Sequence, residues 1–517
     1  MIRALRIGIP LIGGKGWLGG ISYIELLVRA VAGLPKEERP QLFLVLTEHA
    51  IGSLHLHSSI LPLLDGFVLF MENISESDLK KIEGTFTHAG SCEELFTLID
   101  FYYPVQSDVL LGFPAASWIP DFQHIHLPQF FSEHERSVRD SAFGRIARHA
   151  RMVVLSSRDA EGDFRSTFPQ SRVLTRVLNF YSLPDSAWYS SDTADAQRKY
   201  ALPDFFLICC NQFWMHKGHE NLFRALALLK SQGAAVHLAC TGATEDYRAK
   251  GFFSKLLHLV DELGIGDLVH ILGNIPREEQ IQLIRRSVAV VQPSLFEGWS
   301  TVVEDCRVLG KTIILSDLAV HLEQAPEHAV YFRRNDLGDL AQAIHDLLPE
   351  LVPGPDEQRE ARARDAAFGL VERFARQFCS IAEECVLLYS KTGDVSGGEH
   401  WQDLNLRGEE LFMRGDKEGA LALFCSAVER CPSSPAAYNN LGVIFREAGD
   451  FESAVWYFQK AVTLDPFDRP SALNFAAVLV DCRAYENARK VVAGYLCRVP
   501  GDDEARELLE SMSGSGK

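Results

Sequence analysis

The C-terminal part of the chain repeats itself, and this repeat restricts the fold more than any other feature. Equivalent residues recur at a spacing of 34 positions, as Gly408 and Gly442 show. A repeat of this length is one pair of helices that cannot bury its apolar face alone, so neighbouring copies stack. Gly442 and Ala454 are small enough to let the two helices of a copy approach closely. The landmark residues are Gly408, Leu411, Ala420, Phe424, Ala427 and Pro432 in the first copy, Tyr438, Leu441, Gly442, Phe445, Ala454, Phe458, Ala461 and Pro466 in the second, and Ala488, Tyr495 and Pro500 in the weaker third.

Two zones of a different kind precede the repeats. In both, short apolar runs alternate with amphipathic stretches, a pattern typical of strands and crossover helices and hence of a parallel sheet. The expected strands are Leu5–Pro10, Leu42–Leu46, Gly66–Met71 and Met152–Ser156 in the first zone, and Phe205–Cys210, Ala235–Thr241, Val269–Leu272, Val288–Gln292 and Thr312–Ser316 in the second. The expected boundaries are 1–183 and 184–372 for two α/β domains, 373–390 for a further helix, 391–402 for a Gly/Ser-rich linker and 403–513 for three repeats.

The overall charge argues against one class of partner. The formal net charge is -18, whereas binding to nucleic acid requires clustered Lys and Arg, so no nucleic-acid partner is expected. Residues 133–176 are a local exception, with nine Arg against six acids. A solvated helix face explains such a segment, and contact with an anionic membrane surface is the alternative.

Cysteine usage and the N-terminus indicate the compartment. The eleven cysteines form no C-x-x-C pair, which favours a reducing compartment without disulfides or a zinc site. The apolar stretch at the N-terminus is broken by Gly13-Gly14-Lys15 and has no small-residue cleavage site. No window approaches 18 uninterrupted apolar residues, so no membrane span is expected. These observations predict a cytoplasmic protein, with peripheral contact at the inner face of the membrane as the open alternative.

The stretch from Gln292 to Asp305, QPSLFEGWSTVVED, carries the most chemical information. An apolar strand stops at Pro293, a loop containing Gly298 follows, and a helix begins near Ser300 or Thr301. The N-terminus of a helix presents unpaired backbone N–H groups, which bind a diphosphate readily. The Glu297 carboxylate can accept hydrogen bonds from sugar hydroxyls. A second carboxylate in the first helical turns can bind ribose hydroxyls.

Two other loops have the same position after a strand. Asn211–Gly218 follows the expected strand Phe205–Cys210 and contains Gln212 and Lys217. Near the N-terminus, a glycine-rich stretch from Gly13 to Ser22 lies between a strand and a helix expected from Tyr23. Its glycines, Gly19 and Gly20 among them, would allow the backbone to approach a phosphate closely, although they also suit a simple turn.

These motifs together resemble the retaining GT-B glycosyltransferases of the family 4 type. The first stretch resembles the EGFGLPVLEA signature, with Glu297 and Asp305 at its two acidic positions. Glu304 lies one position before the second acidic position of the signature, and a capping box with Thr301 is another explanation for it. Adjacent helical residues diverge by about 100°, so Glu304 and Asp305 cannot both face a cleft. We assign Asp305 to the ribose. Lys217 matches the lysine of G-R-L-x-x-x-K-G, and Gln212 stands in place of its arginine.

The resemblance extends to two further segments. Asp121 matches the acid of the family's His-Asp segment, but Pro120 replaces the histidine. His124 is the substitute candidate for contact with the transferred sugar, and a packing role is the alternative. Gly273 belongs to a shorter match after a strand. His124 and His126 have metal-ligand spacing, as do His55 and His57, but neither pair has an evident third ligand, and no metal site is expected. The repeats resemble tetratricopeptide (TPR) repeats.

The resemblance implies a GT-B fold of two Rossmann-like domains followed by an all-α TPR solenoid, with the 373–390 helix crossing back onto the first domain. It implies transfer from a nucleoside-diphosphate sugar to a glycan, lipid-linked or protein acceptor, with retention of configuration and no cofactor. The donor-binding residues would be Gly19, Gly20, Gln212, Lys217, Gly273, Glu297, Gly298, Ser300, Thr301 and Asp305, and the catalytic ones Glu297, Lys217, His124 and Asp121. The repeats would bind a protein partner.

Two alternatives remain open from the sequence. The missing arginine and histidine favour a catalytically inactive scaffold whose repeats recruit partners, whereas Glu297 and Lys217 disfavour it. A phosphorylase-like enzyme is the second alternative, but no lysine-bearing pyridoxal site is evident.

Overall fold

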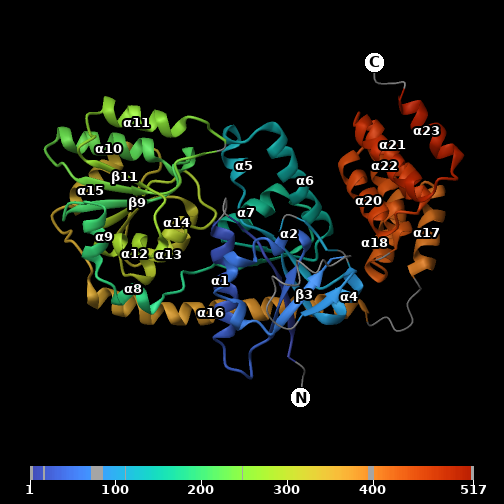
Figure 1. Cartoon of the computed structure of the whole chain (residues 1–517), viewed down its shortest axis with the longest axis horizontal. Coiled ribbons are helices and arrows are strands. Elements are labelled where there is room, and N and C mark those ends of the chain that lie inside the picture. The colour runs from blue at the N-terminus through green and yellow to red at the C-terminus, as the bar shows by residue number, and fades with distance from the viewer. Residues whose placement is uncertain are drawn as a thin grey trace.

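The computed structural model contains two α/β regions and a helical array (Figure 1). It describes residues 4–14, 18–71, 86–106, 108–110, 112–246, 248–393, 401–432 and 434–513. Within these ranges, no helix combines the length and the apolar character needed to cross a membrane.

The first region is built on a parallel eight-stranded sheet of order β4-β3-β2-β1-β5-β6-β7-β8. All four strands expected in this zone are present, with ends that differ by one residue. The edge strand β4 is short and mostly exposed, so the sequence has no apolar run that predicts it. The strands are β1 (Arg6–Pro10), β2 (Gln41–Leu46), β3 (Gly66–Phe70), β4 (Phe86–Ala89), β5 (Phe101–Gln106), β6 (Ala115–Ile119), β7 (Met152–Leu155) and β8 (Leu174–Val177), and the helices are α1 (Leu18–Ala32), α2 (Glu48–Ile51), α4 (Cys92–Leu98), α5 (Gln123–His126), α6 (Glu133–His149) and α7 (Arg158–Thr167).

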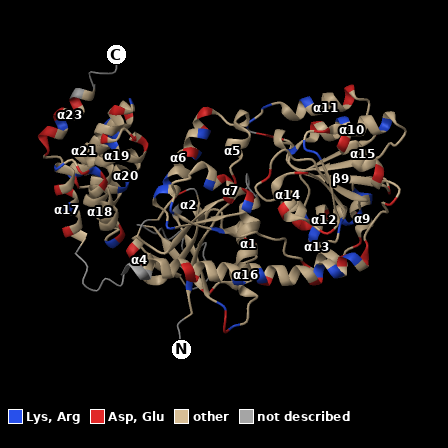
Figure 2. Cartoon of the chain, turned by 180° about the vertical axis from the view of Figure 1, so that it is seen from behind, with Lys and Arg blue, Asp and Glu red and all other residues tan. Residues whose placement is uncertain are grey.

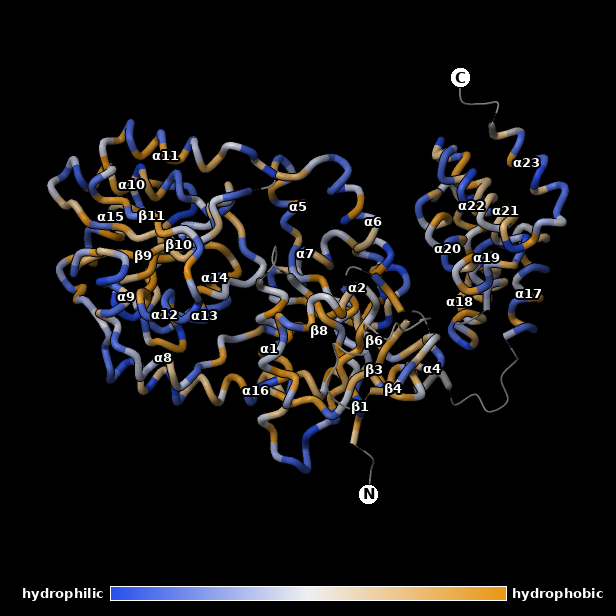
Figure 3. The backbone as a smooth tube through the Cα atoms, viewed as in Figure 1, coloured by the Kyte–Doolittle hydropathy of each residue, from blue (hydrophilic) through white to orange (hydrophobic). Residues whose placement is uncertain are grey.

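The second region has a parallel six-stranded sheet of order β11-β10-β9-β12-β13-β14. The stretch 182–202, which joins the two sheets, contains two short helices. In Figure 3 the central strands of both regions are among the most hydrophobic parts of the chain. The strands are β9 (Phe206–Cys210), β10 (His237–Thr241), β11 (Val269–Gly273), β12 (Ala289–Gln292), β13 (Ile313–Ser316) and β14 (Ala329–Phe332), and the helices are α8 (Ser186–Ser190), α9 (Thr193–Lys199), α10 (His219–Ser231), α11 (Phe252–Glu262), α12 (Arg277–Arg286), α13 (Thr301–Val308), α14 (Ala319–Gln324) and α15 (Leu337–Leu347).

A single helix of 37 residues, α16 (Glu357–Gly393), runs along both regions (Figure 1). It includes the helix expected at 373–390 and begins earlier, at Glu357. Its first part packs on α13, and its later part packs on α1, β5 and β6. Phe374 and Phe378 are buried in the core of the first region. The return of the chain to the first region, which the resemblance implies, is present.

The C-terminal helices form three antiparallel pairs and a final helix. Phe424 and Phe458 fill the space beside Gly408 and Gly442, where an added Cβ would lie 2.5 and 2.6 Å from the ring. Small residues at these positions therefore let the two helices of a repeat approach closely, as the sequence predicts. The helices are α17 (Trp401–Met413), α18 (Lys417–Arg430), α19 (Pro435–Glu447), α20 (Phe451–Leu464), α21 (Arg469–Asp481), α22 (Tyr485–Arg498) and α23 (Asp503–Ser513).

The repeats dock on α6 of the first region. Arg148 donates to Ser453 over 3.1 Å, and Arg151 pairs with Glu429 over 2.7 Å. The His149 ring lies against Tyr457, with its Nε2 2.9 Å from the hydroxyl oxygen. Basic residues of α6 thus lie next to acidic helices (Figure 2). Part of the arginine-rich segment 133–176 is accordingly an internal docking surface, which neither the solvated nor the membrane interpretation anticipated.

Candidate active site between the two sheets

The order of strands places one switch point in each sheet. In the first sheet β1 lies between β2 and β5, and in the second β9 lies between β10 and β12. Loops that leave the carboxyl ends of such neighbouring strands diverge and open a crevice, the usual ligand site of open α/β sheets. The glycine-rich stretch follows β1, and the Lys217 and Glu297 loops follow β9 and β12. The three motifs found in the sequence therefore occupy switch-point positions.

The Lys217 loop owes its position to a glycine. Gly218 has φ 74°, and a Cβ there would lie 2.1 Å from the carbonyl oxygen of Pro293. Leu295 N–H also donates to the carbonyl of His216 over 2.7 Å. A larger residue at 218 would separate the two loops, so this glycine allows Lys217 to reach the loop after β12.

Lys217 and Glu297 form a close ion pair. The Lys217 Nζ lies 2.7 and 2.8 Å from the two Glu297 carboxylate oxygens. Their side chains are only 15% and 8% exposed. A carboxylate this buried is costly unless paired and hydrogen-bonded. The pair meets that condition and holds both candidate groups at one point of the crevice.

Two further residues fix the Glu297 carboxylate. Ser294 Oγ donates to Oε1 over 2.6 Å, and Gln292 Nε2 donates to the same oxygen over 3.0 Å. Gln292 also donates to Ser300 Oγ over 3.2 Å. Both residues lie within 292–305, but the sequence gives no signal for this role because their neighbours become evident only when the loop folds.

Ser300 is the N-cap of α13, and Thr301 is the first helical residue. The Ser300 side chain makes no capping hydrogen bond, and its N–H donates to Gln324 Oε1 over 3.2 Å. The capping box expected between Thr301 and Glu304 is therefore wrong, because the helix begins one residue earlier than that box requires.

Glu304 and Asp305 are both buried and bonded to protein groups. Glu304 accepts from Arg307 over 2.9 Å and from Gln324 over 2.8 Å, and burial raises its pKa. Asp305 accepts from Ser182 over 2.5 Å and pairs with Arg277 over 2.7 Å. The two carboxylates point to different neighbours, as adjacent helical residues must.

The two regions touch beside Glu297. A Cβ at Gly298 would lie 2.8 Å from both Asp121 Cβ and the Pro120 carbonyl oxygen. His126 lies 5.3 Å from the Phe296 ring. The structure thus brings Asp121 next to Gly298.

Arg248, which sequence analysis missed, spans the same interface. It follows β10 and donates to Gln123 of α5 over 3.0 Å, and its Nη2 lies 3.3 Å from His216 Nδ1. Its guanidinium lies 5.0 Å from the Trp214 ring. A lone arginine in an irregular loop gives no sequence signal, because its partners lie far along the chain.

The remaining donor-binding candidates lie in α1, in the loop after β9 and at the end of β11. Gly19 and Gly20 are in the first turn of α1, which begins at Leu18 rather than Tyr23, and residues 15–17 are outside the described residues. Gln212 is half-buried and follows β9. Gly273 ends β11, where its carbonyl accepts from the N–H of Gly242 over 2.9 Å.

His124 faces α6 instead of the ion pair. Its Nε2 lies 3.1 Å from Asp140, and its ring lies 5.3 Å from that of Phe143. The neighbouring His126 bonds to Asp163 over 2.8 Å. Among the described residues, no three His, Cys, Asp or Glu side chains are grouped to hold a metal ion.

Comparison with protein families gives two matches. Residues 191–364 match the model for glycosyl transferases group 1, and residues 405–469 match that for the tetratricopeptide repeat. A curated relative, the serotype-specific mannosyltransferase WbdA from Escherichia coli, is 24% identical over 216 residues. That alignment covers 39% of this chain and 26% of WbdA, so the chain spans about a quarter of this relative.

Among solved structures, two of Anabaena Alr3699/HepE are similar. The complex with UDP has 18% identity and a TM-score of 0.51, and the complex with UDP and glucose has 17% and 0.50. Each alignment covers 75% of this chain and 100% of that chain. This likeness and the tetratricopeptide match together confirm the expected fold, which is a GT-B core followed by a TPR solenoid.

Proposed function

We propose that this protein transfers a sugar from a nucleoside-diphosphate sugar to an acceptor at the crevice between its two sheets. The observation that carries the proposal is the buried Lys217–Glu297 pair at the switch point of the second sheet. Its support comes from the match of residues 191–364 to glycosyl transferases group 1. The similar Anabaena protein is described in complex with UDP, which suggests a nucleotide ligand for this crevice.

The chemistry follows from charge that is held in place before reaction. As the glycosidic bond to the diphosphate breaks, negative charge develops on the leaving oxygen, and Lys217 would stabilise it together with the backbone N–H groups at the start of α13. Such preorganised charge is commonly the largest catalytic contribution. Glu297 would accept hydrogen bonds from hydroxyls of the transferred sugar, and Asp121 lies beside it.

Donor binding would replace the contact between Lys217 and Glu297 with contacts from each residue to the donor. The diphosphate competes for Lys217, and the sugar hydroxyls replace the ammonium at Glu297. Ser294 and Gln292 still hold Oε1, so the carboxylate stays in place when Lys217 moves. In this proposal the reaction retains configuration, and the departing diphosphate takes the acceptor proton on the same face. It requires no metal ion.

The test is donor hydrolysis over a panel of UDP-, GDP-, ADP- and CMP-sugars. We expect slow turnover of one donor, release of the sugar with retained configuration by NMR, and no effect of EDTA. Loss of activity with EDTA that Mn²⁺ restores would overturn the metal-free mechanism. Absence of both binding and turnover with every donor would favour the inactive scaffold, for which Gln212 in place of arginine is the specific argument.

A further inference from the structure

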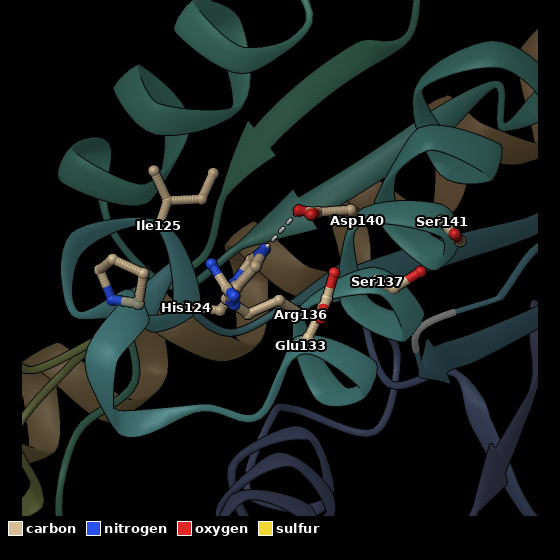
Figure 4. A pocket seen from close by; sticks show the side chains of 8 residues that line it. His124, Ile125, Glu133, Arg136, Ser137, Asp140 and Ser141 are labelled. Carbon is tan, nitrogen blue, oxygen red and sulfur yellow. Dashed lines mark hydrogen bonds and ion pairs between the residues drawn. The ribbon is translucent and has the colours of Figure 1, made fainter.

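A cavity of about 440 Å³ lies between α5 and α6 (Figure 4). Its volume is within the range of small-molecule sites. Three lining residues come from α5 and the turn after it, and five come from α6. They are His124, Ile125, Pro128, Glu133, Arg136, Ser137, Asp140 and Ser141.

The α6 residues form one continuous stripe. Their spacing of three or four places them on the same face of the helix. From Glu133 to Ser141 this face extends roughly 12 Å, from the rise of 1.5 Å per residue. Carboxylate, guanidinium and hydroxyl groups follow one another along it, and Ile125 and Pro128 form an apolar wall opposite.

This lining selects the chemical class of ligand. The mixture of charge signs does not favour an anion, and two apolar residues cannot bury a lipid chain. A pyranose ring presents hydroxyls at its edge and C–H groups on its faces. Alternating hydrogen-bonding groups with an apolar wall suit that shape.

His124 forms the buried floor of the cavity. Burial lowers the pKa of its imidazole, so the ring is neutral near pH 7 and its Nε2–H donates to Asp140 Oδ1. The Asp140 side chain remains 63% exposed. The histidine therefore fixes a carboxylate that can still accept hydrogen bonds from a ligand (Figure 4).

The cavity lies between the crevice and the repeats. At one end, Phe131 and Gln123 contact Arg248 of the second region. At the other end, Ser141 hydrogen-bonds to Glu452 of α20. A chain of sugars bound along α6 would therefore extend from the crevice toward the docked repeats.

We propose that this cavity binds sugar residues of a glycan acceptor, a subsite separate from the donor site. The inference rests on the proposed function and narrows its acceptor to an oligosaccharide. A lipid tail is not the ligand that this stripe recognises.

Saturation-transfer NMR of the full chain with mannotriose and maltotriose tests the proposal. We expect binding of at least one trisaccharide to wild type and at least a tenfold loss of affinity in Ser137→Trp, which fills the cavity. Glu133→Gln, which should fold normally, should weaken binding severalfold. The control is Val138→Trp, because Val138 is 51% exposed and turned about 100° away on the same helix.

Two results would overturn the subsite. One is no trisaccharide binding to wild type, and the other is equal binding by wild type and Ser137→Trp. Calorimetric titration of wild type with UDP, GDP, ADP and CMP separates this failure from that of the proposed function. Nucleotide binding without trisaccharide binding rejects the subsite alone, whereas absence of both rejects the transferase as well.

Discussion

The first α/β region has two interfaces, and they are built differently. Toward the second region, Gly298 lies against the Pro120 carbonyl and the Asp121 Cβ, and Glu323 accepts the N–H of Arg158 at the start of α7 over 2.9 Å. Toward the repeats, half-exposed arginines meet acids around the buried His149–Tyr457 contact. The first interface depends on close backbone approach beside a candidate catalytic pair, and the second on charge and one buried ring. We expect changes at the first to alter activity and changes at the second to alter docking.

The largest effect is expected at the ion pair. Lys217→Ala and Glu297→Ala should each reduce kcat by roughly a hundredfold or more, the usual result of removing one group that stabilises transition-state charge. Steady-state donor hydrolysis measures this. Either variant with wild-type kcat would separate the pair from the chemistry. Glu429→Gln at the repeat interface is the control, with kcat expected to stay at the wild-type value.

Gly298→Ala should be the next most damaging change. Its Cβ would force the two regions apart and cost about 1–3 kcal/mol, as overpacking does. The matched control is Gly162→Ala in α7, where an added Cβ meets nothing within 4 Å and alanine should stabilise the helix by about 0.5–1 kcal/mol. Thermal melting and donor hydrolysis measure both. An unchanged melting temperature in Gly298→Ala would show that the close approach does not limit the fold.

Acid should weaken the repeat interface. Burial, followed by the charge of Arg148, lowers the pKa of His149 to about 4, and Asp450 and Arg145 also face it. Once undocked, the ring regains its ordinary pKa of about 6.5, so the undocked form binds the proton more tightly. The free energy of docking is therefore unchanged above pH 6.5. As the pH falls from 6.5 toward 4, docking becomes weaker by about 1.4 kcal/mol for each pH unit.

Small-angle scattering at pH 7.5 and pH 5 measures this loss as an increase in radius of gyration. His149→Gln, which cannot be protonated, should remove most of the pH dependence. The same increase in His149→Gln and in wild type would assign the effect to other groups.

The smallest effect is expected at the Arg151–Glu429 pair. Its partners are 20% and 43% exposed, and pairs of this kind contribute about 0–1 kcal/mol and weaken with salt. Glu429→Gln should shift thermal melting slightly at low salt and not at 1 M salt. A loss above about 2 kcal/mol would make this interface comparable with the first.

Sequence predicted the elements better than their contacts. Apolar runs and the 34-residue repeat located both sheets and the helical array, because burial leaves a periodic trace along the chain. Lys217 and Glu297 were singled out as candidates, and the structure brings them together; their roles stay predictions. Ser294, Arg248 and the docking face of α6 escaped notice, because contacts between distant segments have no period. The prediction of a capping box at Glu304 was wrong because it depends on the first residue of the helix, and sequence patterns do not fix a helix boundary to one residue.

The long helix α16 restricts how the crevice can open. Its 37 residues span roughly 55 Å at 1.5 Å per residue, and its sides are packed into both regions. A hinge motion that moves one region away from the other would bend this helix and remove its buried phenylalanines from the core. Rotation about the axis of the helix keeps most of those contacts. The two regions would then separate by rotating relative to each other about the axis of α16. The repeats are docked on the first region and would move with it. Because they lie farther from that axis, they would be displaced more than the residues that line the crevice.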